Sequence, residues 1–588
     1  MRIHRLVPGL ALAALALAPP AAVAGGKGSD IGGPPREDVL DDRSRFGPDP
    51  RALGDEEKAA RLDAIEKEYE ANKRNQDLVP VRTRRNGVIF AGEMRYAPAA
   101  KFLKRAFDDD RDVRTRVAAL VAIGKSGDLD TIQYAVKACI ANARKDPVFA
   151  SSLPRMFEHV ENAEAREWLV TRLNQKDDDV LASIVEAVGE AHVESAVPEL
   201  LKLLDRSKDP TVRFETLRAL GKCGGEAAVP KLLVFLSDED WRMRMAAVEG
   251  LGYAGQPRVI EEIRRLVIRG EEQIVVETAI EALGRLGTRD AIEPLIDGLV
   301  VARLRARQKA RRALVAIARD EFRQTKDFNV DPNAWRGWWK KVQRGVDPDD
   351  PNTNERETAS YFNFPIHSDR VLFILDVSGS MDWPDPARDS GIRVSDWKGR
   401  RIDLAHRELT KALNDLAKQN QGRIPEKAKK GETTDIPATP DDDGVEPPTL
   451  FNIATFAGVV TPWQKTPVLA TQDNVNAALA WMLKQLPRGG TATYDALEYG
   501  VSLEGIDTVY FLSDGVPSLG RFEEPETILS EIRKRNRFRR VSINTIALIV
   551  GLSPIESVRK YEDPQDMADL MSRIAYENQG RFANESRP

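Results

Sequence analysis

A short stretch in the second half of the chain places three oxygen-bearing side chains beside one another. The apolar run 371–375 ends at Asp376, and Ser378 and Ser380 follow at intervals of two residues. Such a run is typical of a strand buried on both faces, and Gly379 allows a tight turn after it. Carboxylate and hydroxyl oxygens suit a hard divalent cation, whereas softer metals prefer Cys or His, which are absent nearby. The stretch therefore predicts a Mg²⁺ site, with Mn²⁺ or Ca²⁺ as alternatives.

Two later stretches complete a known pattern. Gly489-Gly490-Thr491 precedes a second apolar strand, which starts at Thr508 and ends at Asp514-Gly515. In this order the three pieces resemble the metal-ion-dependent adhesion site of von Willebrand factor A (vWA) domains. The resemblance implies five metal ligands, which are Asp376, Ser378, Ser380, Thr491 and Asp514. The alternative interpretation is that the two aspartates only cap helices.

The proposed ligand set also predicts how the site would work. Two carboxylates and three neutral hydroxyls do not fully neutralise or enclose a dication, so the ion keeps an open position. By resemblance, an acidic side chain of a partner protein fills that position. We therefore expect an adhesion or docking protein and no enzyme. A metal that only stabilises an envelope scaffold, and a metal-dependent hydrolase, are the alternatives. No phosphate-binding loop and no nucleophile elbow is present.

The residues from 366 onward alternate between predicted strands and helices. After the strand that ends at Asp376, we expect helices at 402–418, 474–486, 525–535 and 566–578, and strands at 450–457, 509–512, 541–550 and 581–583. This alternation predicts a doubly wound α/β (Rossmann-like) domain with a mostly parallel sheet. Ligands of such sheets bind beyond the carboxyl ends of the strands, where both aspartates lie.

Two insertions interrupt the predicted α/β domain. The first, 382–401, starts directly at the metal motif, and the second, 421–448, reads as a surface loop. One hypothesis is that an acid of the first loop, Asp382, Asp385 or Asp389, occupies the open metal position in the resting protein.

A second pattern fills residues 97–345, where glycines recur after an apolar helix. The intervals are 32, 31 and 32 residues, for Gly189, Gly221, Gly252 and Gly284. A period of this size with two helices per unit predicts an α-solenoid, and the units resemble HEAT-like repeats. In one unit, 212–221 reads as the first helix and 228–236 as the second. Stacked pairs leave a concave surface, which we expect to be a second protein-binding surface or a scaffold.

Two features mark the end of the array. The first is a basic run, made of Arg303, Arg305, Arg307, Lys309, Arg311 and Arg312. The apolar residues around it indicate a solvated helix face, with contact to an acidic partner or phosphate as the alternative. The second is Trp335, Trp338 and Trp339, which fall on one side of a helix. They are predicted to cap the open end of the solenoid, and stacking on sugar is the alternative.

The first residues have the features of a secretory signal. A basic start, an apolar core at 6–18 and a small-residue end predict cleavage after Ala24, with an uncleaved anchor as the alternative. No other segment is apolar enough to cross a bilayer. We therefore expect an exported protein in the periplasm, the cell envelope or the medium. Its two cysteines, Cys139 and Cys223, lie in helical patterns and are expected to be buried and unpaired.

These patterns divide the chain into six segments. They are a signal peptide (1–24), a disordered segment (25–54), a helical lead-in (55–96), the α-solenoid (97–345), a linker (346–365) and the vWA domain (366–588). The formal net charge of −5 gives no electrostatic reason to expect a nucleic-acid partner. The predicted partner is a protein.

Overall fold

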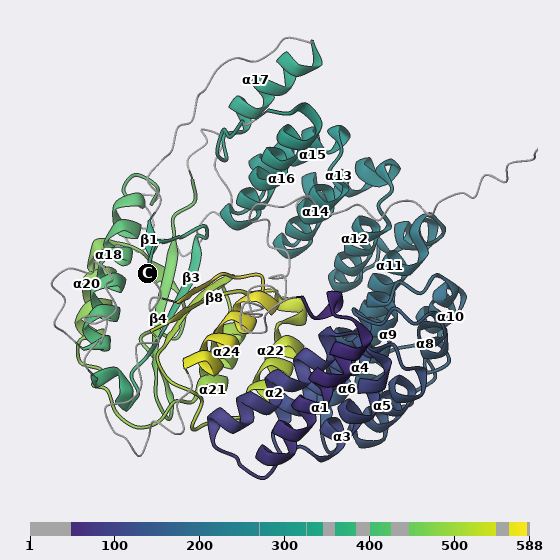
Figure 1. Cartoon of the computed structure of the whole chain (residues 1–588). Coiled ribbons are helices and arrows are strands. Elements are labelled where there is room, and N and C mark those ends of the chain that lie inside the picture. The colour runs from purple at the N-terminus through teal and green to yellow at the C-terminus, as the bar shows by residue number, and fades with distance from the viewer. Residues whose placement is uncertain are drawn as a thin grey trace, which may run out of the picture.

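The structure is a computed structural model that describes residues 49–269, 271–324, 326–344, 359–383, 400–424, 446–548 and 564–584. The predicted signal peptide lies outside these residues. The amino-terminal part is an α-solenoid (Figure 1). Its helices are α1 (Asp55–Asn72), α2 (Leu78–Glu93), α3 (Ala100–Asp109), α4 (Val113–Ser126), α5 (Leu129–Asn142), α6 (Pro147–Ser151), α7 (Leu153–Phe157), α8 (Ala163–Val170), α9 (Asp178–Glu190), α10 (Val197–Arg206), α11 (Pro210–Phe235), α12 (Trp241–Ala254), α13 (Ile260–Ile268), α14 (Gln273–Leu286), α15 (Ile292–Val301), α16 (Leu304–Phe322) and α17 (Pro332–Gln343).

The predicted repeat appears as two stacked layers of helices. Helices α4, α7, α9, α11, α12, α14 and α16 pack successively against one another and form the inner layer. The two helices predicted at 212–221 and 228–236 are both present within α11, which breaks at Gly225, where φ is 44°. The helical lead-in continues the same core, because Leu62 and Tyr69 of α1 are buried in it.

The repeating glycines lie where neighbouring inner helices approach most closely. A Cβ atom on Gly189 would lie 3.2 Å from the Cα of Ala219, and one on Gly252 would lie 2.9 Å from the Cβ of Ala282. A Cβ on Gly284 would likewise lie 2.9 Å from the Cβ of Ala313. The period seen in the sequence is therefore a packing period, since only a very small residue fits at each crossing.

The end of the array differs in part from the expectation. Trp335, Trp338 and Trp339 are buried in the solenoid core, which confirms their predicted capping role. The prediction of a solvated basic face is wrong for Arg305 and Arg307, whose exposed fractions are 7% and 2%. Both arginines are covered by contacts that lie far away in the sequence. The two cysteines are buried and unpaired, as predicted.

The carboxyl-terminal part is a vWA-like α/β domain. Its strands are β1 (Ser360–Tyr361), β2 (Phe364–Pro365), β3 (Arg370–Asp376), β4 (Leu450–Phe456), β5 (Val460–Pro462), β6 (Val468–Leu469), β7 (Thr508–Ser513), β8 (Ser542–Ala547) and β9 (Phe582–Asn584). Its helices are α18 (Arg401–Gln419), α20 (Gln472–Met482), α21 (Thr493–Ser502), α22 (Pro525–Arg539) and α24 (Pro564–Glu577). The main sheet has the order β5-β4-β3-β7-β8-β9, with β6 also paired to β4. Strands β3, β4, β7, β8 and β9 are parallel, as predicted.

Apolar residues on both faces of the sheet hold the two helical layers. Phe373 and Leu375 point into a core formed with α18 and α20, whereas Leu372 and Ile374 point into a core formed with α21, α22 and α24. The run 371–375 is therefore buried on both faces, as expected of a central parallel strand. Residues 359–365 of the expected linker form the hairpin β1–β2, and its Tyr361 is buried against the first core.

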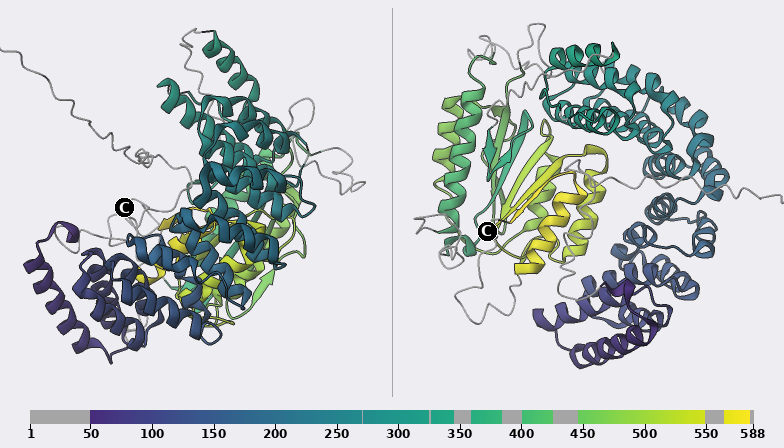
Figure 2. Two further views of the ribbon diagram at one scale, coloured as in Figure 1. Left: turned by 90° about the vertical axis from the view of Figure 1, so that its right-hand side faces the viewer. Right: turned by 45° about the horizontal axis from the view of Figure 1, so that its top comes forward.

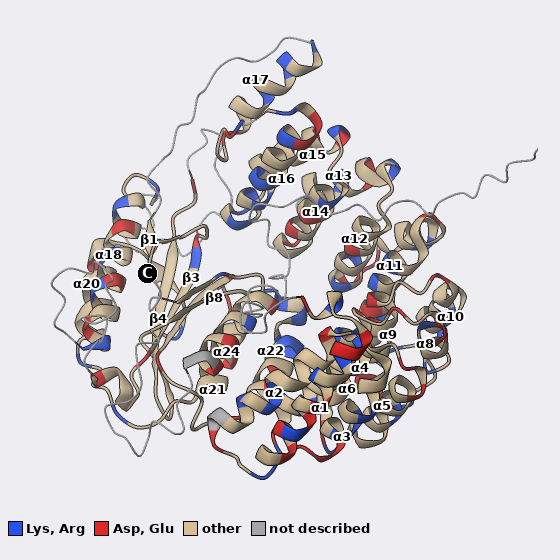
Figure 3. Cartoon of the chain, in the orientation of Figure 1, with Lys and Arg blue, Asp and Glu red and all other residues tan. Residues whose placement is uncertain are grey.

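The solenoid curves around the second of these helical layers. In Figure 2 the arc of helices faces α21, α22 and α24, while α18 and α20 lie on the far side of the sheet. Figure 3 shows that acidic and basic residues are spread over both parts. The two parts of the chain pack against each other, since Arg537 of α22 pairs with Glu215 of α11.

Candidate functional site

The first loop of the candidate site is held by the side chain at its start. Asp376 ends β3 and is fully buried. Its Oδ1 accepts a hydrogen bond of 2.7 Å from the backbone N–H of Ser378, and its Oδ2 accepts one of 2.5 Å from Ser513 Oγ. The carboxylate therefore fixes the turn after β3 and ties it to the neighbouring strand β7.

A chain of oxygen atoms runs from this loop to the end of β7. Ser378 Oγ lies 3.0 Å from Ser380 Oγ, and Ser380 Oγ donates to Asp514 Oδ1 at 2.7 Å. The other oxygen of Asp514 accepts a hydrogen bond of 2.7 Å from a guanidinium N–H of Arg401. The register of the parallel sheet explains this meeting, because β3 and β7 are adjacent and end at the same edge.

The loop with Thr491 is fastened to both of the other loops. The backbone N–H of Gly379 donates to the Gly489 carbonyl at 2.9 Å, which joins the first and second loops. The Thr491 N–H donates to Ser518 Oγ at 3.0 Å, and the Ser518 N–H donates to the Thr491 carbonyl at 3.0 Å. These backbone bonds hold the threonine hydroxyl in place without using it.

The hydroxyls of Thr491 and Ser380 face the same small space above Gly515. A Cβ atom added to Gly515 would lie 3.1 Å from Thr491 Oγ1 and 3.5 Å from Ser380 Oγ. A glycine at this position therefore keeps open a cradle that any side chain would fill. The structure thus brings all five predicted side chains to one place, four of them in a hydrogen-bonded chain and the fifth beside it.

The surroundings of the candidate site disfavour ionisation of both Asp376 and Asp514. Burial, and then the charge of Asp514, raise the pKa of Asp376 to about 7. Burial likewise raises the pKa of Asp514, although the charge and hydrogen bond of Arg401 act in the opposite direction. The pair has one cationic partner within the described residues, namely Arg401 on Asp514. Further positive charge at this point would favour ionisation of both acids.

The donor set fits a hard cation. The five predicted side chains present only oxygens, and the cradle above Gly515 is bordered by two of them. Among the described residues no group of three or more His, Cys, Asp or Glu side chains forms a metal cluster. Any ion at this point would therefore depend on hydroxyl oxygens in addition to the two carboxylates.

Three residues of the site were not predicted from the sequence. Ser513 could have been found, since it directly precedes Asp514 at the end of the same strand. Ser518 and Arg401 carried no signal. Arg401 is the first residue of α18, and its guanidinium also lies over the ring of Trp383, 5.3 Å from the ring centroid.

Two expectations about neighbouring residues can be compared with the structure. Asp382 forms an ion pair of 2.8 Å with Arg400 and is exposed, so in this structure it does not contact the candidate site. Asp385 and Asp389 lie outside the described residues, as does most of the second insertion. The serines are bonded to each other and to acids, and within the described chain no histidine donates to them.

Comparisons with known proteins agree with both halves of the chain. A family model for HEAT repeats matches residues 166–237 and 229–315. Inter alpha-trypsin inhibitor, heavy chain 4, of Mus musculus is 24% identical over 29% of this chain and 15% of its own length. Von Willebrand factor A domain-containing protein 3A of Homo sapiens is 30% identical over 17% of this chain and 8% of its own length. This chain thus spans less than a sixth of either relative.

Among solved structures, a von Willebrand factor type A protein from Catenulispora acidiphila overlaps 35% of this chain and 42% of its own, at 12% identity and a TM-score of 0.18.

None of the helices in the described residues combines the length and apolar character needed to span a membrane. The chain therefore carries HEAT repeats, followed by a vWA-like α/β domain with sequence similarity to vWA-containing proteins.

Proposed function

We propose that this chain binds a protein partner through a divalent cation held by its vWA-like domain. The residues that would hold the ion are Asp376, Ser378, Ser380, Thr491 and Asp514. Mg²⁺ is the first candidate, with Mn²⁺ or Ca²⁺ as alternatives. When bound, the ion supplies positive charge with an incompletely filled shell, to which a carboxylate of the partner can bind.

The observation that carries this proposal is the convergence of three loops around an oxygen-lined cradle that holds two buried acids. Burial raises the pKa of both acids, and the charge of Asp514 raises the pKa of Asp376 further. If the two carboxylates had only a structural role, each would be expected to pair with a cationic side chain. Among the ion pairs of the described residues, Arg401 pairs with Asp514. The arrangement is thus under-neutralised, which favours the binding of a cation.

The surface beside the site supports a macromolecular ligand. Val459 and Leu519 are large apolar residues with exposed fractions of 73% and 43%. Leu519 lies against Gly490 in the threonine loop, and its N–H bonds to the Thr491 carbonyl at 3.3 Å. Exposed apolar side chains next to a candidate ion site favour a protein partner, whose own apolar residues can cover them.

The proposal includes export, for which the predicted signal peptide is the support. A non-catalytic role is also part of the proposal. The alternative, a scaffold whose ion only stabilises the fold, is favoured by no separate observation and is tested by the same experiment.

The test is capture of partner proteins from an envelope extract by the immobilised full chain. We expect capture in Mg²⁺, loss of capture in EDTA, and loss in the Asp376→Ala and Thr491→Ala variants. Asp382→Asn is the matched control, because this acid lies in the same loop but pairs with Arg400. Capture that persists in EDTA and in both variants would contradict the proposal. Loss of thermal stability in EDTA without loss of capture would support the scaffold role.

A further inference from the structure

The inner face of the solenoid carries buried acidic residues at positions that an ordinary repeat core fills with apolar ones. Glu215 of α11 and Glu249 of α12 have exposed fractions of 2% and 5%. Glu281 of α14 lies on the same layer, 32 residues after Glu249. A buried carboxylate is costly unless a cation pairs with it. Within the array, Arg218 pairs with Glu215 and Glu249, and Lys309 pairs with Glu281, so each of these cations or acids is shared and a further cation can pair from the inner face.

The cations come partly from the carboxyl-terminal domain. Arg537, on α22, forms an ion pair of 2.8 Å with Glu215. Arg540, which directly follows α22, bonds to Glu249 and lies 3.6 Å from Glu281. Against the effect of burial, Arg218 and Arg540 lower the pKa of Glu249 below its usual range. We call Glu215, Glu249 and Glu281 the acidic stripe. The basic end of α22 lies against it.

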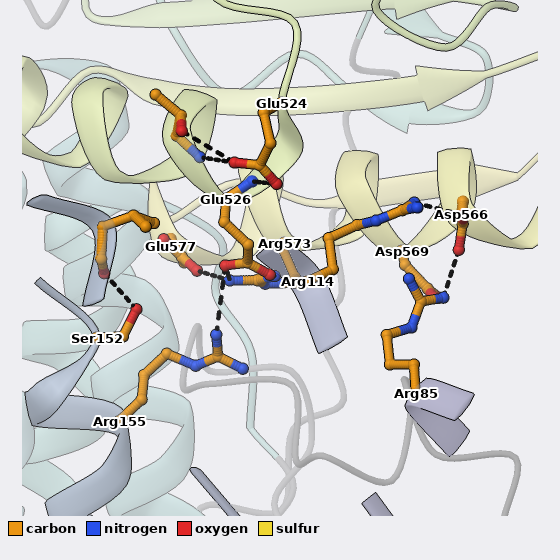
Figure 4. A network of polar contacts seen from close by, with 12 residues as sticks. Arg85, Arg114, Ser152, Arg155, Glu524, Glu526, Asp566, Asp569, Arg573 and Glu577 are labelled. Carbon is orange, nitrogen blue, oxygen red and sulfur yellow. Dashed lines mark hydrogen bonds and ion pairs between the residues drawn. The ribbon is translucent and has the colours of Figure 1, made fainter. Parts of the chain in front are cut away.

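A second cluster of ion pairs lies further toward the amino-terminal repeats. Figure 4 shows Asp566, at the start of α24, between Arg85 of α2 and Arg114 of α4. The distance from Arg114 to Asp566 is 2.5 Å. Glu526, in the first turn of α22, binds Arg573 of α24 and lies 3.7 Å from Arg155 of α7 (Figure 4).

Helix α16 of the last repeat also contacts the α/β domain. Arg305 of α16 donates to the backbone carbonyls of Asp507 and Arg540, the latter at 3.0 Å. Arg307 of the same helix donates to Glu446 at 2.7 Å. Arg305 and Arg307 are the buried members of the basic run. The acid that pairs with Arg307, Glu446, belongs to the same chain.

Apolar contact across this interface is small by comparison. Phe538 of α22 is the residue of the carboxyl-terminal domain that packs on the solenoid core within the described chain. Its ring stands edge-on to Phe214, with the centroids 5.1 Å apart. The interface is therefore built mainly from charge pairs, which is typical of a contact between separate folded parts rather than of one continuous core.

We propose that the inner face of the solenoid is a receptor for a basic helix, and that α22 of the same chain occupies it in the resting protein. The acidic stripe recognises the helix through the spacing of its two arginines, Arg537 and Arg540. Because α22 is part of the α/β core, the array is then closed to an outside basic helix until the α/β domain moves away from it. This inference does not depend on the metal site.

The first test is cross-linking across the contact. Ser151 Oγ of α6 lies 2.8 Å from Ser530 Oγ of α22, so a Ser151→Cys/Ser530→Cys chain should form a disulfide rapidly under mild oxidation. The matched control is Ser195→Cys/Ser530→Cys, because Ser195 is exposed and bonds to Glu167 within the array. The native cysteines are buried and should not interfere.

The second test uses a fluorescent peptide of residues 522–541 as a probe for the acidic stripe. The full chain with Arg537→Glu/Arg540→Glu should release the α/β domain from the acidic stripe and bind the peptide roughly 10-fold or more tightly than wild type does, because wild type is closed in most molecules. Arg539→Glu is the control on the same helix, since its side chain bonds only to the Leu503 carbonyl among the contacts described. When the charge reversal is combined with Ser151→Cys/Ser530→Cys, oxidation should abolish peptide binding, and reduction should restore it.

Two results would overturn the inference. One is cross-linking of Ser151→Cys/Ser530→Cys no faster than the Ser195→Cys control. The other is equal peptide affinity of wild type, the charge-reversed chain and the Arg539→Glu control.

Discussion

Two regions of this molecule, the contact between its parts and the candidate metal site, bury acidic side chains in opposite ways. In the contact between the solenoid and the α/β domain, each buried acid faces two or more cations, as Glu526 faces Arg573 and Arg155. At the candidate metal site, Asp376 and Asp514 face each other, and Arg401 contacts only Asp514. Although burial opposes it, the arginines lower the pKa of Glu526 to about 2, whereas the pKa of Asp376 is raised to about 7.

The difference separates the acids that hold the structure together from the two acids that we propose bind a cation. A paired acid stabilises the folded state and loses this effect when it is protonated. An under-neutralised acid destabilises the folded state until a cation arrives. The same residue type thus has a structural role in one region and a proposed binding role in the other.

The largest expected effect comes from breaking a paired acid. Glu526→Gln removes the buried acid that Arg573 and Arg155 share and leaves Arg573 with Glu577 alone, so it should lower the free energy of unfolding by about 3 kcal/mol. Chemical denaturation of the full chain measures this. Glu531→Gln is the control, since Glu531 forms a partly exposed pair with Lys534 in the same helix, and should cost less than about 1 kcal/mol. Equal effects of the two changes would contradict the assigned role of the contact.

The pH dependence should differ in sign between the two regions in metal-free protein. Glu526 has a folded-state pKa below its usual value of 4.5, so its stabilisation is present above that pH and is lost as the pH falls toward about 2. Asp376 has a raised pKa, so stability should fall as the pH rises from about 4 to about 7. Urea unfolding in EDTA across this range, with wild type and Asp376→Asn, separates the two. A variant profile identical to that of wild type between pH 4 and 7 would disprove the second part.

A smaller effect of opposite sign is expected from removing an under-neutralised acid. Asp376→Asn relieves the repulsion with Asp514, and in EDTA should raise the free energy of unfolding by about 1 kcal/mol. The same variant should lose the stabilisation that Mg²⁺ gives to wild type. Thermal unfolding with and without Mg²⁺ measures both changes. Destabilisation in EDTA comparable to that of Glu526→Gln would place Asp376 among the structural acids.

The smallest expected effect concerns the apolar part of the contact. Phe538→Leu removes the edge-on contact with Phe214 and keeps most of the buried area, so it should cost about 0.5 kcal/mol. Denaturation of the full chain is again the measurement. A cost larger than that of Glu526→Gln would show that apolar packing, rather than charge pairing, holds the two halves together.

Much of the architecture could be predicted from local patterns in the sequence. The glycine period predicted the repeats because it reflects a packing period, as the contact of Gly252 with Ala282 shows. The alternation of strands and helices predicted the parallel sheet. The ends of two apolar strands predicted the meeting of Asp376 and Asp514, because neighbouring parallel strands end at the same edge. Helix α21 (Thr493–Ser502) was not predicted from the sequence.

The contact between the two halves could not be predicted in this way. Arg540 and Glu249 are separated by 291 residues, and no periodicity relates one to the other. Arg305 and Arg307 looked like members of a solvated face, because the sequence shows their charge but not the Asp507 carbonyl and Glu446 that cover them. Arg401 was missed for the same reason, since its role depends on the position of α18 relative to β7.

The measurement that tests the central claim most directly is a Mn²⁺ titration of the full chain, followed by electron paramagnetic resonance near neutral pH. Wild type and the Asp382→Asn control should bind one tightly held ion per chain. Asp376→Asn should lose that ion. Its Mn²⁺ affinity should fall by more than the roughly 10- to 100-fold that is typical when a residue outside the ligand shell is removed. Equal binding by Asp376→Asn and wild type would contradict the claim that these acids are kept for a cation.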